Sequence, residues 1–220
     1  MEKILIAGAT GNTGKRIVEI LNSSESFAPV AMIRKEEQQQ IFDDMGVKSV
    51  LADLEGDVNK AFEKVPEIDK VIFAAGSGSK TGADKTTSVD EEGAKKLIDA
   101  AKENKVKKFI LLSSMGTNNP EEADESMQHY LKAKKAADEY LQASGLTYTI
   151  VRPGQLSDDM GIAKVKVAKQ LGEYGEIPRD DVAFIMVMAL ADPLTKNMVF
   201  EAIEGETPIK QALIELSGIG

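Results

Sequence analysis

The first fourteen residues, MEKILIAGATGNTG, constrain the fold of this chain more than any other stretch. Residues 4–7 are an apolar run of strand length, and glycines follow at positions 8, 11 and 14. A helical pattern comes next, and its apolar side is made by Ile17, Val18, Ile20 and Leu21. Strand, glycine turn and helix in this order are the context in which a glycine motif binds a dinucleotide. The alternative is a tight β-to-α turn that binds no ligand.

Each glycine of this loop has a physical role in binding a pyrophosphate. Gly8 permits the tight turn off the strand, Gly11 lets the backbone approach the pyrophosphate, and Gly14 lets the helix pack against the strand. The free N–H groups and the positive end of the helix dipole then face the phosphates. We therefore expect a cofactor-binding loop made of Gly8, Thr10, Gly11, Asn12, Thr13 and Gly14.

The segment GATGNTG resembles the cofactor loop of the short-chain dehydrogenase/reductase superfamily. Its Gly-x-x-Gly-x-x-Gly spacing is similar to that of the extended and atypical branches, which include the NmrA-like proteins and the NAD(P)-dependent epimerase/dehydratase group. The resemblance runs along most of the chain. It implies an α/β fold with a doubly wound parallel (Rossmann) sheet in three α/β/α layers, strand order 3-2-1-4-5-6, and the cofactor across the carboxyl edge. We expect a single NAD(P)-binding domain over residues 1–220, in which residues 153–220 form a small substrate-side region.

Composition excludes several other classes of function. The net charge of −9 argues against broad binding to nucleic acid or to an anionic membrane. The chain has no cysteine and one histidine, His129, which argues against disulfides, thiolate chemistry, a metal site and a Ser-His-Asp triad. The N-terminus lacks a signal-peptide pattern and no segment is apolar enough to span a membrane, so we expect a cytoplasmic protein.

Alternating strand and helix patterns continue after the glycine loop. Further strands are expected at residues 29–34, 47–54, 70–76, 107–114, 147–154, 164–168 and 198–203. Further helices are expected at residues 36–45, 57–65, 89–104, 126–144, 179–191 and 208–216. The run at 70–76 is almost continuously apolar, as is typical of a strand buried on both faces.

The second strand ends in a basic pair, Arg34 and Lys35. Arg34 lies about where this fold places the residue that contacts the ribose. A guanidinium there suits a 2′-phosphate, whereas an acidic residue would repel it, so we expect NADP(H) to be preferred over NAD(H). The alternative is a solvated basic pair offset by Glu36 and Glu37.

Asp53 and Leu54 end the third strand. In the superfamily that this chain resembles, an Asp-hydrophobic pair at this place lines the adenine pocket. The resemblance therefore implies that Asp53 accepts a hydrogen bond from the adenine amino group. The alternative is an Asp that caps the turn after the strand.

Ala74, Ala75 and Gly76 correspond, by the same resemblance, to the segment that passes the ribose and pyrophosphate. The Gly/Ser-rich loop 76–82 after them is expected to be mobile without ligand. Asp90 then stands near a helix start where related enzymes have an Asn that supports the catalytic lysine through water. This difference leaves the reaction open, and helix capping is the alternative role for Asp90.

The fifth strand ends in Ser113 and Ser114, and chemistry in a doubly wound sheet lies at the carboxyl ends of the strands. Ser114 best matches the superfamily's substrate-orienting serine, and Ser113 is the other candidate and an expected cofactor contact. In the helix that follows, Tyr130 and Lys134 are four residues apart and share a face, whereas Asp138 is expected to lie away from it.

The pair resembles the Tyr-x-x-x-Lys motif of the superfamily. A free phenol has a pKa of about 10 and is a poor base at neutral pH, but a nearby ammonium stabilises its deprotonated form. The resemblance implies that Tyr130 donates a proton to a carbonyl during reduction and that Lys134 supports it and binds the nicotinamide ribose. Ser114 would hold the substrate oxygen. The alternative is that this spacing on a helix has no catalytic meaning.

The sixth strand runs into Arg-Pro-Gly, which matches the segment that passes the nicotinamide, so Pro153 and Gly154 are expected to contact the cofactor. Three functions then compete. The first is an NADPH-dependent oxidoreductase acting on a small carbonyl or quinone-like compound. The second is an NAD(P)-dependent epimerase or dehydratase, for which the short tail is a weak fit. The third is a non-catalytic NADP(H) sensor of the NmrA-like type. The substrate is not indicated, and a homodimer is possible.

Overall fold

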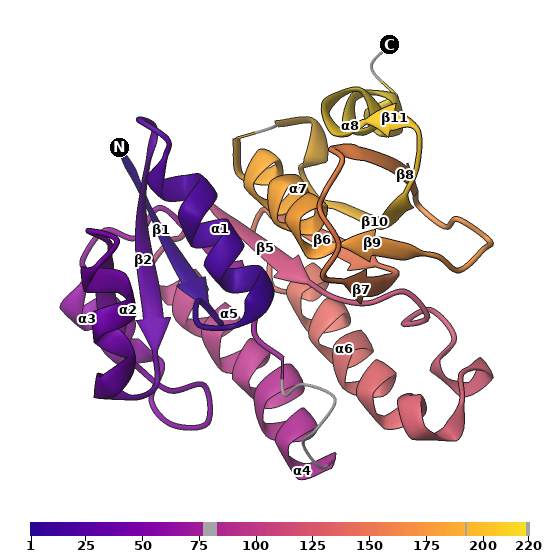
Figure 1. The fold of residues 1–220 in the computed structure, drawn as a ribbon. Coiled ribbons are helices and arrows are strands. Elements are labelled where there is room, and N and C mark those ends of the chain that lie inside the picture. The colour runs from indigo at the N-terminus through magenta and orange to yellow at the C-terminus, as the bar shows by residue number, and fades with distance from the viewer. Residues whose placement is uncertain (77–82, 192, 219–220) are drawn as a thin grey trace.

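The computed structural model describes residues 1–76, 83–191 and 193–218, within which nine strands form one sheet (Figure 1). The strand order is β11-β8-β10-β6-β5-β4-β1-β2-β3. The first six strands of the chain, which all pair in parallel, are β1 (Glu2–Ala7), β2 (Phe27–Ile33), β3 (Lys48–Leu51), β4 (Lys70–Phe73), β5 (Lys108–Leu112) and β6 (Tyr148–Pro153). They lie in the order 3-2-1-4-5-6, so the predicted doubly wound topology is confirmed.

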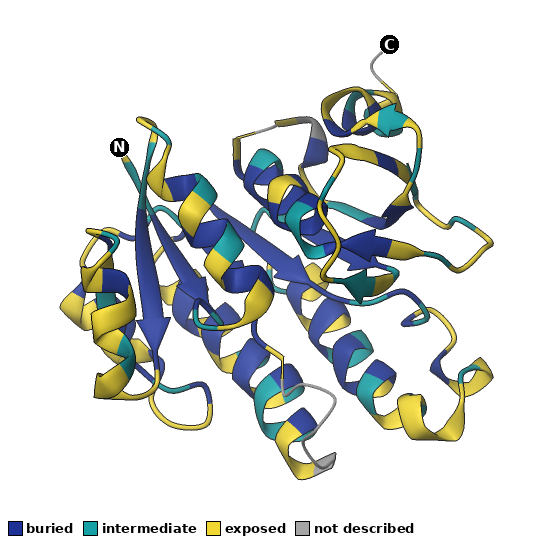
Figure 2. Cartoon of the chain, in the orientation of Figure 1, coloured by how far each residue is buried: buried dark blue, intermediate teal, exposed yellow. Residues whose placement is uncertain are grey.

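Helices cover both faces of this sheet, because the side chains of each strand alternate between two apolar clusters. In β1, Ile4 and Ile6 belong to one cluster, and Leu5 and Ala7 belong to the other. The first cluster is closed by α1 (Asn12–Asn22), α2 (Gln39–Asp43), α7 (Arg179–Ala191) and α8 (Ile209–Ser217). The second is closed by α3 (Asn59–Lys64), α5 (Ala94–Glu103) and α6 (Glu125–Ala143). Figure 2 shows the buried strands between these layers, so the predicted three-layer arrangement is confirmed.

Three strands end earlier than the sequence predicts. β3 ends at Leu51, β4 at Phe73 and β5 at Leu112, each short of the expected end. The backbone N–H of Ala74 still donates to the Ala7 carbonyl at 2.9 Å, but the chain then leaves the sheet. The polar and small residues that follow these strands therefore lie beyond the sheet, at its carboxyl edge.

The helix expected over 89–104 starts earlier and is not uniform. Residues Ala83–Lys85 form α4, the π-helical segment η2 spans Thr86–Gly93, and α5 follows directly. Gly93 lies against Leu54, since a Cβ at Gly93 would be 2.9 Å from the Leu54 Cβ. The expected helix over 36–45 also divides, into a 3-10 turn η1 (Glu36–Gln38) and α2. The expected Gly/Ser-rich mobile loop lies, from residue 77 to 82, outside the described residues.

The tail adds strands that the sequence analysis did not all find. β10 (Met198–Glu204) extends the parallel sheet beside β6, and β8 (Lys164–Ala168) pairs with β10 in antiparallel fashion. The remaining elements are short: β7 (Gln155–Ser157), β9 (Glu176–Pro178), β11 (Thr207–Pro208) and the 3-10 turns η3 (Pro120–Glu122) and η4 (Pro193–Thr195). Such short segments carry too few residues for a periodic pattern. Across the described ranges, no helix has the length and apolar character needed to cross a membrane.

Candidate functional site

The glycine loop joins β1 to α1 in the geometry that a pyrophosphate requires. Gly8 has a φ of +84°, and a Cβ there would lie 2.5 Å from the backbone nitrogen of Ala75. A Cβ at Gly14 would overlap the Gly8 carbonyl oxygen, so the helix packs directly on the end of the strand. The Gly11 N–H donates to the Gly8 carbonyl at 3.0 Å and closes the turn. Both close approaches require glycine, as the motif predicts.

The N-terminus of α1 is open toward this loop. Gly11 occupies the N-cap position, and within the described part of the chain no side chain caps the helix there. The N–H groups of the first turn, which a capping side chain would otherwise occupy, can therefore donate to an anion. Thr13 and Gly14 are buried in this turn, whereas Asn12 is exposed beside it and Thr10 is half-buried in the preceding loop.

The basic pair after β2 is presented to solvent at the same edge. Arg34 and Lys35 are both exposed, and their backbone N–H groups donate to the Gln38 Oε1 at 3.0 and 3.1 Å. This hydrogen bonding fixes the backbone and leaves the two cationic side chains to solvent. Among the described residues, the salt bridges involve neither Arg34 nor Lys35. The alternative, an offset by Glu36 and Glu37, is thus not made by direct ion pairs among the described residues.

Asp53 and Leu54 follow β3 beside this pair. The Asp53 Oδ1 accepts from the Glu55 N–H at 3.0 Å, so this carboxylate closes a local turn, while Leu54 is buried. Glu55 in turn binds Lys85 at 2.7 Å. The hydrogen bond from Lys85, with a second one from Ser88, lowers the pKa of the Glu55 carboxyl. The loop after β3 is thereby tied to α4 and η2.

Lys134 is the centre of a buried cluster at the ends of β4 and β5. Its Nζ lies 2.9 Å from the Asp90 Oδ1 and donates to the carbonyls of Leu112 at 3.2 Å and Ala75 at 3.5 Å. The Tyr130 ring lies one helical turn away, with its centroid 5.7 Å from the ammonium. Lys134 is 3% exposed and Asp90 is fully buried. The structure therefore brings Asp90 of η2 together with Tyr130 and Lys134 of α6.

The electrostatics of this cluster favour a charged lysine. Burial alone would lower the pKa of the Lys134 ammonium, but the neighbouring Tyr130 and Asp90 outweigh it, and the pKa of Lys134 is raised. A buried ammonium is tolerated only with such partners. Asp90 is able to supply this charge because η2 turns it inward. Ala75 supplies a carbonyl, and Gly76, which is exposed, continues the same edge.

The two serines after β5 point to different partners. The Ser113 hydroxyl is buried and donates to the Asp138 Oδ2 at 2.9 Å. The Ser114 hydroxyl is only half-buried and donates to the carbonyl of Met115 at 3.1 Å. Ser114 is therefore the more accessible of the two hydroxyl groups.

The expectation that Asp138 lies away from the buried face of α6 is wrong. Asp138 is fully buried, and its Oδ2 also accepts from the Arg152 Nε at 2.9 Å. Burial raises the pKa of the Asp138 carboxyl, and the Arg152 guanidinium opposes this shift. The signal was present in the sequence, since Asp138 is four residues after Lys134 and so lies on nearly the same face of the helix. The arginine of Arg-Pro-Gly is the partner that a buried acid there requires.

Pro153 and Gly154 continue β6 toward the same edge. The Pro153 carbonyl accepts from the Met115 N–H at 2.9 Å, next to Ser114. The Gly154 N–H donates to the Ala202 carbonyl on β10 at 2.9 Å. These bonds hold the Arg-Pro-Gly segment beside the loop that carries the two serines.

The tail after β6 is attached to α1 through ion pairs that the sequence analysis missed. The Arg16 Nε in α1 donates to the Asp180 Oδ1 at 2.5 Å, and Asp180 also accepts from the Gly161 N–H at 3.2 Å. Arg16 and Arg179 both pair with Asp158, at 3.7 and 3.0 Å. No local motif marks the contacts of Arg16, because they join residues more than a hundred positions apart.

The geometry agrees with comparisons to known proteins. The family described as NAD(P)H-binding matches residues 8–193. This chain belongs to the NAD(P)H-binding family. The glycine loop is the part of the chain that fits such a cofactor, so the cofactor of this chain is an NAD(P).

Full-length relatives share both the sequence and the fold. The chain is 42% identical over 97% of its length to YhfK of Bacillus subtilis, all of which is covered and whose name is that of an uncharacterized sugar epimerase. A solved structure from Bacillus halodurans, whose name suggests an NAD-dependent epimerase/dehydratase, is 40% identical with a TM-score of 0.93; 98% of this chain and 100% of that one are covered. The oxidoreductase YlbE from Lactococcus lactis is 30% identical with a TM-score of 0.85, over 97% and 96% of the two chains.

Proposed function

We propose that this protein is an NADPH-dependent oxidoreductase that reduces a small carbonyl or quinone-like compound. The observation that carries the proposal is the buried Lys134 ammonium, which lies beside the Tyr130 ring and is held by Asp90 at the carboxyl ends of β4 and β5. A buried cation next to a phenol is the arrangement that proton transfer from tyrosine needs. The name of the Lactococcus relative, an oxidoreductase, is in line with it.

The roles of the residues follow from their positions. NADPH, when bound, supplies the hydride that reduces the carbonyl carbon. Tyr130 donates its phenolic proton to the carbonyl oxygen, and Lys134 stabilises the phenolate that remains. Ser114, the more accessible serine, donates a hydrogen bond to the same oxygen and orients it. Asp90 is a positioning residue, since it fixes the ammonium of Lys134 and keeps it charged.

The proposed preference for NADPH rests on Arg34 and Lys35. Both side chains are exposed at the end of β2, next to the loop after β3 that is proposed to line the adenine pocket. Their charges are not paired with acids among the described residues, so they are available to a 2′-phosphate. A guanidinium can grip a phosphate with two parallel hydrogen bonds.

The substrate side presents apolar side chains to solvent. Met160 and Ile162 are exposed in the loop held by Asp180, and Tyr174 is 79% exposed. The Tyr174 hydroxyl lies 3.6 Å from the Cβ position of Gly116, close to the loop that carries Ser114. An exposed aromatic ring close to the loop that carries the serine suits a flat, weakly polar substrate better than a sugar diphosphate.

Two observations favour other functions. The names of the two Bacillus relatives favour an epimerase or dehydratase, in which the cofactor is regenerated within one turnover. The binding of Lys134 to Asp90 and two carbonyls would equally serve a non-catalytic NADP(H) sensor, because the lysine then holds three segments together.

The test is NADPH consumption by the pure protein against quinones, aldehydes, ketones and flavins, with NADPH binding titrated alongside. Turnover on one class, with tight NADPH binding, is the expected result. Tight binding without consumption of NADPH on any class would contradict the reductase. Conversion of a sugar nucleotide without net NADPH consumption would identify an epimerase instead.

A further inference from the structure

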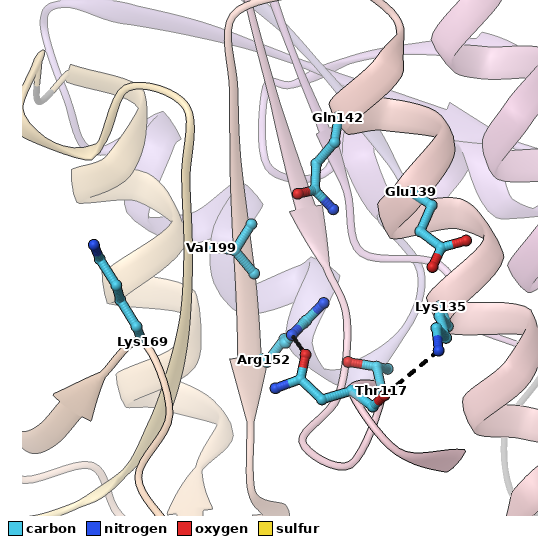
Figure 3. A pocket seen from close by; sticks show the side chains of 8 residues that line it. Thr117, Lys135, Glu139, Gln142, Arg152, Lys169 and Val199 are labelled. Atoms are coloured by element: carbon cyan, nitrogen blue, oxygen red, sulfur yellow. Dashed lines mark hydrogen bonds between the residues drawn. The ribbon is translucent and has the colours of Figure 1, made fainter. Parts of the chain in front are cut away.

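We propose that a polar hollow beside the C-terminal half of α6 is a second binding site, which takes a small molecule carrying a phosphate or carboxylate group. We call it the α6–β10 hollow. It has a volume of about 460 Å³ and is lined by Thr117, Asn118, Lys135, Glu139, Gln142, Arg152, Lys169 and Val199 (Figure 3). This volume is in the range of pockets for small molecules. None of these residues belongs to the glycine loop or to the cluster around Tyr130 and Lys134.

The inner wall of the hollow is a guanidinium held in place by buried partners. Arg152 is 7% exposed, its Nε donates to the Asp138 Oδ2 at 2.9 Å, and its Nη1 donates to the Asn118 Oδ1 at 2.5 Å. Among the described residues, these bonds leave Nη2 of Arg152 unused. A fixed guanidinium with a remaining donor loses little conformational freedom when it binds an oxyanion.

Two lysines add positive charge to the walls. Lys135 Nζ donates weakly to the Asn118 carbonyl at 3.4 Å, so it lies near the inner wall. Lys169 lines the opposite side from the segment after β8, and its amino group points away from Arg152 (Figure 3). The lining residues comprise three cations and one acid, Glu139, and Arg152 is also paired with the buried Asp138, so a net positive charge remains. This local excess of positive charge occurs in a chain whose net charge is −9. Such an excess disfavours a cationic ligand and favours an anion.

The neutral part of the lining is rich in hydrogen-bonding groups. Thr117, Asn118 and Gln142 supply a hydroxyl and two amides, and Val199 is the one apolar side chain of the set. A macromolecular docking surface would be expected to present more apolar area at its centre. The combination therefore suits a small polar anion, with the charged group at Arg152 and Lys135 and hydroxyls toward the amides.

The hollow is connected to the proposed active site through a short chain of hydrogen bonds. Arg152 binds Asp138, and Asp138 accepts from the Ser113 hydroxyl, which directly precedes Ser114. Asp138 Oδ1 is buried and has no hydrogen-bond partner among the described residues. An anion that binds Arg152 would therefore change the interaction of Arg152 with Asp138, the acid that accepts from Ser113 at the end of β5.

The test is a titration of inorganic phosphate and, separately, of tricarballylate into the full chain saturated with NADPH, followed by backbone amide NMR. NADPH occupies the glycine loop, so that phosphate binding there is suppressed. We expect saturable shifts at residues 117–118, 135–142, 152 and 169 with at least one of the two anions. The arm that binds tells a phosphate ligand from a carboxylate ligand.

Charge variants show whether the shifts report a built site. Lys135→Gln/Lys169→Gln should weaken binding about tenfold or more, since it removes two of the three positive charges that line the hollow. Lys102→Gln/Lys210→Gln changes the net charge equally at exposed positions on α5 and α8 and should leave the affinity within about twofold. Absence of saturable shifts with both anions, shifts confined to the glycine loop, or equal weakening in both double variants would overturn the proposal.

Discussion

Two buried ion pairs lie along α6, and they differ in what surrounds them. Lys134 pairs with Asp90 at the carboxyl edge of the sheet, beside the Tyr130 ring and the ends of β4 and β5. Four residues further along, Asp138 pairs with Arg152 between the sheet and the α6–β10 hollow. Both acids are fully buried.

The difference between the pairs lies in the third group that each one contacts. The Lys134–Asp90 pair has an aromatic hydroxyl side chain next to its cation, so it can support proton transfer. The Arg152–Asp138 pair instead has a serine and an asparagine around it: the Ser113 hydroxyl donates to Asp138, and the Asn118 Oδ1 accepts from Arg152. An arginine stays protonated at any relevant pH. We infer that the first pair supports the chemistry, whereas the second positions the strand ends.

The largest expected effect comes from breaking the second pair. Asp138→Asn leaves the Arg152 guanidinium buried without a counter-charge, which should reduce the free energy of unfolding by about 3–5 kcal/mol. Glu139→Gln, at the exposed neighbouring position, should change it by less than about 0.5 kcal/mol. Urea unfolding of both variants measures this. Equal stabilities would show that the Arg152–Asp138 pair is not structural.

The next largest effects are expected from the two serines, one assigned to the active site and the other to the Arg152–Asp138 pair. Ser114→Ala should lower kcat/KM by about tenfold to a hundredfold without loss of stability, because it removes a hydrogen bond to the substrate oxygen. Ser113→Ala should cost about 1–3 kcal/mol of stability, because it removes a buried donor to Asp138. Steady-state kinetics and urea unfolding measure kcat/KM and the free energy of unfolding for both variants. The opposite pattern would make Ser113 the serine of the active site.

Arg34→Asp tests the cofactor edge. The change should shift the ratio of NADPH to NADH affinities toward NADH by about tenfold or more, since a carboxylate repels the 2′-phosphate. Lys102→Asp, with the same change of charge on α5, is the control. Fluorescence titration of both cofactors measures the ratio. Unchanged relative affinities in Arg34→Asp would remove the 2′-phosphate assignment.

The smallest effect is expected from the half-exposed pair of Arg16 and Asp180. The hydrogen bond from Arg16, with that from Gly161, lowers the pKa of Asp180 below its ordinary value of 3.8. Its contribution to stability is therefore present above about pH 3.8 and is lost as the pH falls through the lowered pKa. In Asp180→Asn the free energy of unfolding should fall less steeply as the pH decreases into the acid range, while its pH dependence above about pH 5 stays unchanged. An unchanged acid limb would contradict this pKa shift.

The sequence predicted what local patterns determine. The glycine spacing predicted the turn at Gly8 and the close packing at Gly14, and the resemblance that this loop carries implied the strand order. The same patterns could not predict long-range partners. The pairing of Arg16 with Asp180, and of Arg152 with Asp138, depends on how the tail folds back on the sheet. The inward turn of Asp90 depends on a π-helical segment, for which the sequence carries no periodic signal.

The position of the serine hydroxyls was also open in the sequence. Two adjacent serines after a strand must point to different sides, but which side faces the edge depends on where the strand pairing ends. β5 ends at Leu112, and this directs Ser113 to Asp138. Only the structure could therefore distinguish the buried serine from the accessible one.

The most direct test of the central claim is the rate of NADPH oxidation by Tyr130→Phe, measured on the acceptor that the wild type reduces best. Phenylalanine keeps the ring beside Lys134 but removes the proton donor. We predict that turnover falls by about a hundredfold or more while NADPH binds with nearly unchanged affinity. A variant that turns over at the wild-type rate would exclude Tyr130 from the chemistry and leave the Lys134–Asp90 pair with a structural role alone.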